Sequence, residues 1–387
     1  MTTRISARIR SIPDSGLLHF FDILATMDDV LSLGIGEPDM PTPQPIREAA
    51  IASIRQGQTG YTSNAGIREL RHQVAAYLRR RYGVEYDPDG EILVTVGVSE
   101  ALLAAMLALL DPGDAVLVPE PCFVAYDPSV RLAGGDPIGI PTLAAEGFQV
   151  DVARLVAAST PRTRALLIGY PSNPTGAVLD RERAMEVARF VTERDLILIS
   201  DEIYDRFVYG VEHTCLAALP GMQSRTLLLG GFSKSYAMTG WRVGYACGPR
   251  EIITAMHKVH QYAIMSAPTP GQVAALEALT CAVDPAETIT REFAARRDVL
   301  LHGLRTIGLP CVEPRGAIYA FPSVAHLGCS AQAFSERLLL EEKVAVVPGN
   351  AFGPSGEGHV RIAYTVSTDM LEDALERIDR FVQRFRA

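Results

Sequence analysis

The sequence has few cysteines, and none of them is spaced as in a metal or redox motif. Six occur in 387 residues, at positions Cys122, Cys215, Cys247, Cys281, Cys311 and Cys329. No two form a C-x-x-C pair, so neither a zinc site nor a dithiol redox centre is indicated. Cysteines scattered through a chain of this length are typical of a reducing compartment.

A basic surplus, a long apolar run and a targeting segment are also lacking. The formal net charge of -9 argues against a nucleic-acid partner. The longest apolar run, at 101–110, is too short to span a bilayer. The basic stretch at 1–16 has no apolar run behind it, which argues against a secretory signal. We therefore expect a cytoplasmic protein without a membrane or nucleic-acid partner.

Repeats and low-complexity segments are absent, and two patterns alternate in the middle of the chain. Continuous apolar runs are typical of strands buried on both faces, and they occur at 92–96, 115–118, 165–168, 196–199 and 226–229. Helical patterns such as 100–110 and 181–194 separate them. The alternation predicts an α/β fold whose large domain has a mostly parallel central sheet flanked by helices.

The two ends of the chain differ from its middle. The first 45 residues are rich in Pro and Gly, which indicates an extended arm. After residue 285 we expect a helix, a short strand, a second helix, a strand pair and a last helix. The chain also exceeds the ~250–300 residues at which single cores stop growing. We predict an arm that joins the small domain at 1–45, a large domain at 46–285 and a small α+β domain at 286–387, with 272–280 and the next helix as the bridge.

Glycines and polar residues follow two of the predicted strands, where ligands bind in open parallel sheets. After the first strand, Gly97-Val98-Ser99-Glu100 leads directly into a helix that Ser99 is placed to cap. Free backbone N–H groups at such a helix start suit a phosphate, although an ordinary capped turn explains the pattern as well. Asn173, between Ser172 and Pro174, follows another strand, and its amide is free to donate a hydrogen bond to a ligand. A plain turn explains this position as well.

Two further strand ends carry charged residues. Asp201 directly follows an apolar run, where a buried carboxylate is costly unless it meets a positive partner or caps the next helix. Lys234 lies among Gly, Phe and Ser, an unusual setting for a residue that normally occupies solvated faces. A P-loop requires Gly before the Lys, where this chain has Ser233, and no G-x-G-x-x-G dinucleotide motif is present.

Together, the motifs resemble one family over nearly the whole chain. Their order and spacing are similar to those of the class I/II aminotransferases, the aspartate aminotransferase-like enzymes of pyridoxal-phosphate fold type I. The motifs that carry the resemblance are Tyr61…Gly66, Asn173-Pro-Thr-Gly, Asp201-Glu-x-Tyr204, Ser233-Lys234 and Gly240-x-Arg242-x-Gly244.

The resemblance implies pyridoxal 5'-phosphate, bound mainly by the large domain, and ping-pong transfer of an amino group from an L-amino acid to a 2-oxo acid. Lys234 would hold the cofactor as an aldimine and then serve as general base and acid. Asp201 would keep the pyridine nitrogen protonated. Asn173 and Tyr204 would hydrogen-bond the phenolic oxygen, which makes Lys234, Asp201 and Tyr204 the implied catalytic residues.

The resemblance also assigns the remaining binding residues. Phe123 would stack on the cofactor ring, unless it is only core packing, and Ile203 would cover the other face. The phosphate would be bound by Val98, Ser99, Ser233, Arg242 and, from the neighbouring subunit of a homodimer, Tyr61.

The resemblance assigns a substrate-binding pair as well. Arg361 would grip the substrate carboxylate with two parallel bonds, unless it is a surface strand arginine. Gly36 would bring backbone close to that carboxylate, and the N-terminal arm would close over the substrate.

The reaction and the substrate stay open at this level. C–S β-elimination, 1-aminocyclopropane-carboxylate synthesis and decarboxylation use the same fold, because the cofactor supplies the chemistry. An aminotransferase-like ligand sensor is a further alternative, although no helix-turn-helix extension precedes residue 45. Ser99 stands where some aspartate-specific relatives have lysine, so aromatic, alanine-like or broad amino donors remain candidates beside aspartate and glutamate.

Overall fold

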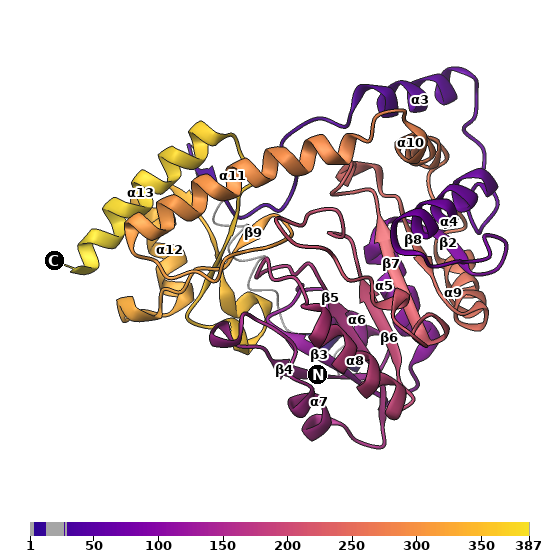
Figure 1. Cartoon of the computed structure of the whole chain (residues 1–387), viewed down its shortest axis with the longest axis horizontal. Coiled ribbons are helices and arrows are strands. Elements are labelled where there is room, and N and C mark those ends of the chain that lie inside the picture. Colours follow the sequence, from indigo (N-terminus) through magenta and orange to yellow (C-terminus); the bar gives the residue numbers. More distant parts are fainter. Residues whose placement is uncertain (1–3, 13–26, 28, 387) are drawn as a thin grey trace.

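A seven-stranded sheet forms the centre of the large domain (Figure 1). The computed structural model describes residues 4–12, 27 and 29–386. The strand order is β2-β8-β7-β6-β5-β3-β4, and β8 is antiparallel to both of its neighbours while the other pairs are parallel. The strands are β2 (Ile92–Thr95), β3 (Ala115–Glu120), β4 (Asp136–Pro141), β5 (Thr163–Gly169), β6 (Ile197–Asp201), β7 (Thr226–Gly231) and β8 (Gly244–Cys247). The predicted α/β class is confirmed.

Two of these strands were not predicted, for different reasons. β4 contains two prolines and a glycine, residues that argue against a strand, but it lies at the edge of the sheet, where one side of the backbone needs no partner. β8 is only four residues long and follows the loop that holds Arg242. Its Gly244 is required, because an added Cβ would lie 2.8 Å from the backbone carbon of Gly97.

Helices cover both faces of the sheet and bury the apolar side chains that its strands present on each face. They are α3 (Gln44–Arg55), α4 (Arg68–Tyr82), α5 (Gly97–Leu109), α6 (Tyr126–Leu132), α7 (Val152–Ala158), α8 (Arg181–Glu193), α9 (Arg250–Ala263) and α10 (Thr269–Thr280). A four-residue helix, α1 (Ala7–Arg10), precedes the large domain. None of the helices in the described ranges combines the length and apolarity that a membrane crossing demands.

The smaller part of the molecule is built from both ends of the chain. Its strands are β1 (Leu31–Ser32), β9 (Tyr319–Ala320), β10 (Val344–Ala345), β11 (Val347–Pro348) and β12 (Val360–Ala363). β1 pairs with β10, and β12 lies between β11 and β9. Its helices are α11 (Pro285–Ile307), α12 (Ala331–Glu342) and α13 (Thr368–Arg386). The predicted boundaries at 1–45, 46–285 and 286–387 stay a prediction, and residues 13–26 and 28 of the arm lie outside the described residues.

Helix α11 connects the two parts (Figure 1). Asp284 caps its first turn, since the side chain accepts from the backbone N–H of Ala286 at 3.0 Å. The helix then runs to α13 and packs against it, whereas α10 packs on α3 and α4. Of the predicted bridge, α11 therefore spans the two parts and α10 belongs with the large one.

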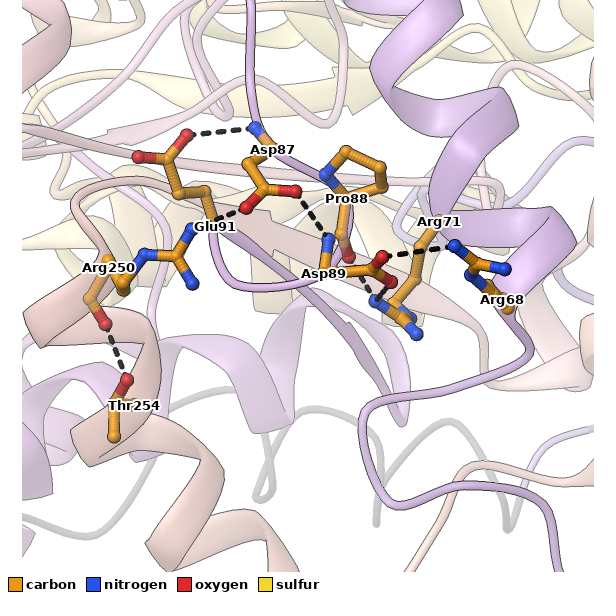
Figure 2. Close-up of polar contacts among 8 residues, drawn as sticks. All are labelled: Arg68, Arg71, Asp87, Pro88, Asp89, Glu91, Arg250 and Thr254. Atoms are coloured by element: carbon orange, nitrogen blue, oxygen red, sulfur yellow. Dashed lines mark hydrogen bonds and ion pairs between the residues drawn. The ribbon is translucent and has the colours of Figure 1, made fainter.

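Charged side chains fix the loop at 87–90, here called the β2 entry loop, between α4 and α9 (Figure 2). Asp89 accepts from Arg68 at 3.2 Å and from Arg71 at 3.1 Å, and Asp87 is paired with Arg250. The Asp89 backbone N–H donates to Asp87 at 2.9 Å. These contacts set the start of β2, whose other end leads into Gly97 and the predicted phosphate turn.

Candidate active site

A cavity of about 310 Å³ lies where the carboxyl ends of the large-domain strands meet β9 and β12. This volume is in the range of small-molecule sites. Every predicted site residue except Tyr61 lines it: Gly36, Val98, Ser99, Phe123, Asn173, Asp201, Ile203, Tyr204, Ser233, Lys234, Arg242 and Arg361. Tyr61 is 86% exposed and is not among the residues that line the cavity.

Asp201 is the last residue of β6 and is only 6% exposed. Its carboxylate accepts from the Tyr126 hydroxyl at 2.9 Å and from the backbone N–H of Ile203 at 3.2 Å. Burial raises the pKa of Asp201 to about 6, although both hydrogen bonds and the charge of Lys234 act in the opposite direction. A cation brought into the cavity would therefore be bound strongly by this carboxylate.

Lys234 follows β7 and reaches into the same cavity. Its ammonium group donates to the backbone carbonyl of Gly36 at 2.6 Å. This acceptor is neutral, so the hydrogen bond leaves the positive charge of Lys234 without a carboxylate partner among the residues that the structure describes. Lysine is rare in the chain, which has only Lys234, Lys258 and Lys343, and this rarity is a further sequence signal that favours a special role for Lys234.

The turn after β2 has the geometry of an anion site, but Ser99 does not cap its helix as predicted. Helix α5 begins at Gly97, three residues before the predicted start at Glu100, and Val96 is the N-cap without a side-chain bond. Glu100 instead accepts from the backbone N–H of Val96 at 2.6 Å. The prediction failed because Gly97, with φ of +71°, allows the chain to turn directly into the helix.

Arg242 closes the other side of this turn. A Cβ added to Gly97 would lie 2.7 Å from its guanidinium, so only glycine lets the two approach so closely. Arg242 donates to the Thr239 carbonyl at 2.8 Å, and Ser233 lines the cavity beside it. Backbone N–H groups, a hydroxyl and a guanidinium thus converge, a donor set that suits a phosphate.

Arg361 lies on β12 and is 6% exposed, so the alternative of a surface arginine is wrong. Its guanidinium donates to the Asn173 side-chain oxygen at 2.8 Å and to the Gly34 carbonyl at 2.6 Å. Burial lowers the pKa of Arg361. Within the described part of the chain, its Nε has no hydrogen-bond partner although it is buried. An unsatisfied donor on a buried cation marks a place for an anionic ligand.

Two tyrosines of the site were missed. Tyr126, the first residue of α6, donates to Asp201, and its ring meets Phe123 edge-on at 5.8 Å. Tyr319 of β9 has its hydroxyl 2.7 Å from that of Tyr204. Tyr126 stands three positions after Phe123, in the same stretch of sequence, and Tyr319 lies in the short strand predicted after residue 285. Neither position carries a local pattern that indicates its partner.

Comparison with known proteins places the chain in one family. The pattern of the family described as aminotransferase class I and II matches residues 28–378. A putative aminotransferase YugH from Bacillus subtilis is 48% identical and covers 99% of this chain and 100% of its own. An aspartate aminotransferase from Pyrococcus abyssi is 43% identical over 98% of both chains.

Solved structures agree with this placement. The crystal structure of Pyrococcus protein-A1 has a TM-score of 0.96 and 43% identity, and the match covers 98% of both chains. The fold, the cavity at the strand ends and the full-length relatives point to one conclusion. The chain belongs to the class I and II aminotransferase family and is an aminotransferase.

Proposed function

We propose that the cavity binds pyridoxal 5'-phosphate and that the enzyme moves an amino group from an L-amino acid to a 2-oxo acid. The family is pyridoxal-phosphate-dependent. The observation that carries the proposal is that Asp201 and Lys234 line one cavity, with the carboxylate buried and its pKa raised to about 6 by desolvation. This buried carboxylate lacks a cationic partner, and a protonated pyridine ring would supply one.

The other end of the cavity fits the phosphate of the same cofactor. Val98 and Ser99 would offer backbone N–H groups from the first turn of α5, and Ser233 and Arg242 would offer side-chain donors. Phe123 and Ile203 would pack against the two faces of the ring. When bound, pyridoxal phosphate supplies an aldehyde that combines with amines and a ring that accepts electrons from the substrate α-carbon.

The protein's own groups then bind and orient the substrate and move its protons. Arg361 would bind the substrate α-carboxylate through its free Nε edge, with Gly36 backbone close by. The amine of Lys234 would take the proton from the substrate α-carbon as general base and deliver it to C4′ of the cofactor as general acid. Asn173 and Tyr204 would donate hydrogen bonds to the cofactor's phenolic oxygen.

A homodimer completes the proposal. Tyr61 is exposed and outside the cavity of its own chain, so it would reach the phosphate of a partner subunit. The cytoplasmic location stays a prediction. The amino donor is left to experiment, because one relative is named an aspartate aminotransferase and another only a putative aminotransferase.

The test is a half-reaction with a panel of L-amino acids. The protein loaded with pyridoxal phosphate is mixed with one donor and no 2-oxo acid, and its absorbance spectrum is followed. We expect conversion to the pyridoxamine form and release of a 2-oxo acid in equal amount. Continuous release of pyruvate and ammonia from a cysteine-type donor, without the pyridoxamine form, would instead establish the C–S lyase alternative.

A further inference from the structure

Tyr319 touches more parts of the site than any role described above requires. It lies on β9 of the small domain, is 1% exposed and lines the cavity. Its hydroxyl is 2.7 Å from the hydroxyl of Tyr204, which belongs to the large domain. The two rings meet edge-on, with centroids 5.7 Å apart. A buried side chain of one domain thus fixes a proposed cofactor ligand of the other.

The ring of Tyr319 also supports the substrate-binding arginine. The guanidinium carbon of Arg361 lies 4.5 Å from the Tyr319 ring centroid and 4.7 Å from that of Phe352. Aromatic faces attract a guanidinium and hold its plane. This contact leaves the edge with the unpartnered Nε as the part of Arg361 that still lacks a ligand.

The segment at 34–36 fits against the same tyrosine. A Cβ added to Gly36 would collide with the hydroxyl end of Tyr319. The Gly36 carbonyl accepts from Lys234, and the Gly34 carbonyl accepts from Arg361. The position of Tyr319 therefore constrains the backbone that both cationic residues contact.

We propose that Tyr319 is a positioning residue that aligns the Tyr204 hydroxyl for the cofactor and the Arg361 guanidinium for the substrate carboxylate. The inference rests on the proposed function of the cavity. When the Tyr319 hydroxyl donates to the Tyr204 oxygen, the Tyr204 hydrogen is directed to a second acceptor, the cofactor's phenolic oxygen. The hydroxyl and the ring of Tyr319 thus have separate tasks, and different substitutions separate them.

Tyr319→Phe removes only the hydroxyl. We expect the pH at which the bound cofactor changes its visible absorbance to rise by about half a unit, because a weaker donor stabilises the ionised phenolic oxygen less. kcat should fall by roughly 3- to 10-fold, the value of one hydrogen bond of a buried hydroxyl. The dissociation constant of hydrocinnamate, a carboxylate without an amino group, should stay within about twofold of the wild-type value, because the ring under Arg361 remains.

Tyr209→Phe is the matched control. The Tyr209 hydroxyl is buried and donates to the Ala317 carbonyl at 2.6 Å, so it also crosses from the large domain to the small one. Tyr209 does not line the cavity. Its variant should match the wild type in absorbance titration and in hydrocinnamate binding. A shift in this control equal to that of Tyr319→Phe would reduce the role of Tyr319 to holding the domains together and overturn the proposal.

Tyr319→Leu tests the ring. This variant should show the same shift in the absorbance titration as Tyr319→Phe. It should also bind hydrocinnamate about 5-fold or more weakly than the wild type, since a cation–π contact of a buried arginine disappears. Circular dichroism at the assay temperature confirms the fold of each variant, and Tyr319→Phe decides the matter if the Leu variant does not fold. An unchanged absorbance titration in Tyr319→Phe contradicts the inference. Wild-type protein that shows no cofactor absorbance at all contradicts the proposed function instead.

Discussion

The β2 entry loop and the cavity both concentrate charged residues, but their charges are satisfied in opposite ways. In the loop, Asp89 is paired with Arg68 and Arg71 and is half exposed to water. Its pKa is lowered, chiefly by the hydrogen bond from Arg68. In the cavity, Asp201 is buried, bonded to a hydroxyl and a backbone N–H, and its pKa is raised by desolvation.

The two regions differ in whether their charged groups are paired within the protein or are available to bind a ligand. Arginine–carboxylate pairs at the surface are complete without any other molecule, and each contributes little. Among the residues that the structure describes, the cavity groups lack such partners. Asp201 has its pKa raised by burial, the Lys234 amine donates to a neutral carbonyl, and the Nε of Arg361 has no hydrogen-bond partner. Perturbed and unsatisfied groups gathered in one cavity are typical of a functional site. The following variants test this contrast, beginning with the largest effect.

Replacing Lys234 by Ala should reduce kcat by at least about 10³-fold, because the proposed acid–base group is lost. The fold should remain, since the hydrogen bond that the amine makes within the described part of the chain goes to a single backbone carbonyl, that of Gly36. Single-turnover kinetics measure the loss, and Lys258→Ala on the exposed side of α9 is the control. Turnover of Lys234→Ala within tenfold of the wild type would remove this lysine from the reaction.

Replacing Asp201 by Asn should reduce kcat by roughly 10²- to 10³-fold, because an amide cannot hold a proton on the ring nitrogen as a carboxylate does. The Tyr126 hydroxyl retains an acceptor, so the local structure should be kept. Steady-state kinetics with the preferred donor give the value. Asp89→Asn, a carboxylate of the entry loop, should keep full activity. Equal activities of the two variants would mean that the buried and the exposed carboxylate do not differ in function.

Replacing Arg361 by Lys should raise KM for the amino donor by roughly 10- to 100-fold and change kcat much less. An ammonium group cannot form two parallel bonds to a carboxylate. It also loses the contacts to Asn173 and Gly34 in their present geometry. Initial rates over a range of donor concentrations measure the split. A lower kcat with unchanged KM would show that Arg361 acts on something other than substrate binding.

The stability of the cofactor-free protein should depend on Asp201 in a direction opposite to that of ordinary acids. Its pKa is raised from 3.8 to about 6 in the folded state, so its protonated form is favoured there. The associated stability is present below about pH 4 and is lost as the pH rises through about 6, by about 3 kcal/mol. Urea unfolding measures the free energy of unfolding of the wild type and of Asp201→Asn at pH 5 and at pH 8. Between these two pH values the Asn variant should lose less stability than the wild type. A larger loss in the variant would contradict the raised pKa.

Asp89→Asn should have the smallest effect. The lowered pKa of Asp89 means that its contribution is present at neutral pH and is lost as the pH falls through the folded pKa. Because the pair with Arg68 is exposed, salt should screen most of the contribution. The urea midpoints of the wild type and of Asp89→Asn should therefore differ at low salt and become equal at high salt. A large loss that persists in high salt would mean that the entry loop is more than a surface ion-pair cluster.

The sequence was sufficient where a strand end and a motif coincide. Asp201 ends one buried strand, and Asn173 and Lys234 follow two others. Parallel strands bring their carboxyl ends together, so these residues share one cavity. Arg361 was found through the resemblance and its strand-like context. The alternating α/β pattern also predicted five strands of the central sheet and missed the edge strand β4 and the short β8.

The rest depends on contacts that spacing does not encode. Tyr126 meets Asp201 across 75 residues of sequence, and Tyr319 meets Tyr204 across 115. Tyrosine in a strand or at a helix start is typical of core packing, so only the folded chain reveals these hydroxyl partners. The helix start at Gly97 was misplaced because its positive φ and its close approach to Arg242 and Gly244 appear only in the folded chain.

Identification of the lysine that bonds to the cofactor tests the central claim most directly. The protein is loaded with pyridoxal phosphate, reduced with borohydride, digested and analysed by mass spectrometry. The chain has only Lys234, Lys258 and Lys343, so the assignment is unambiguous. We predict the reduced cofactor on the peptide that contains Lys234 and on no other. A tag on Lys258 or Lys343, or no tag at all, would contradict the account.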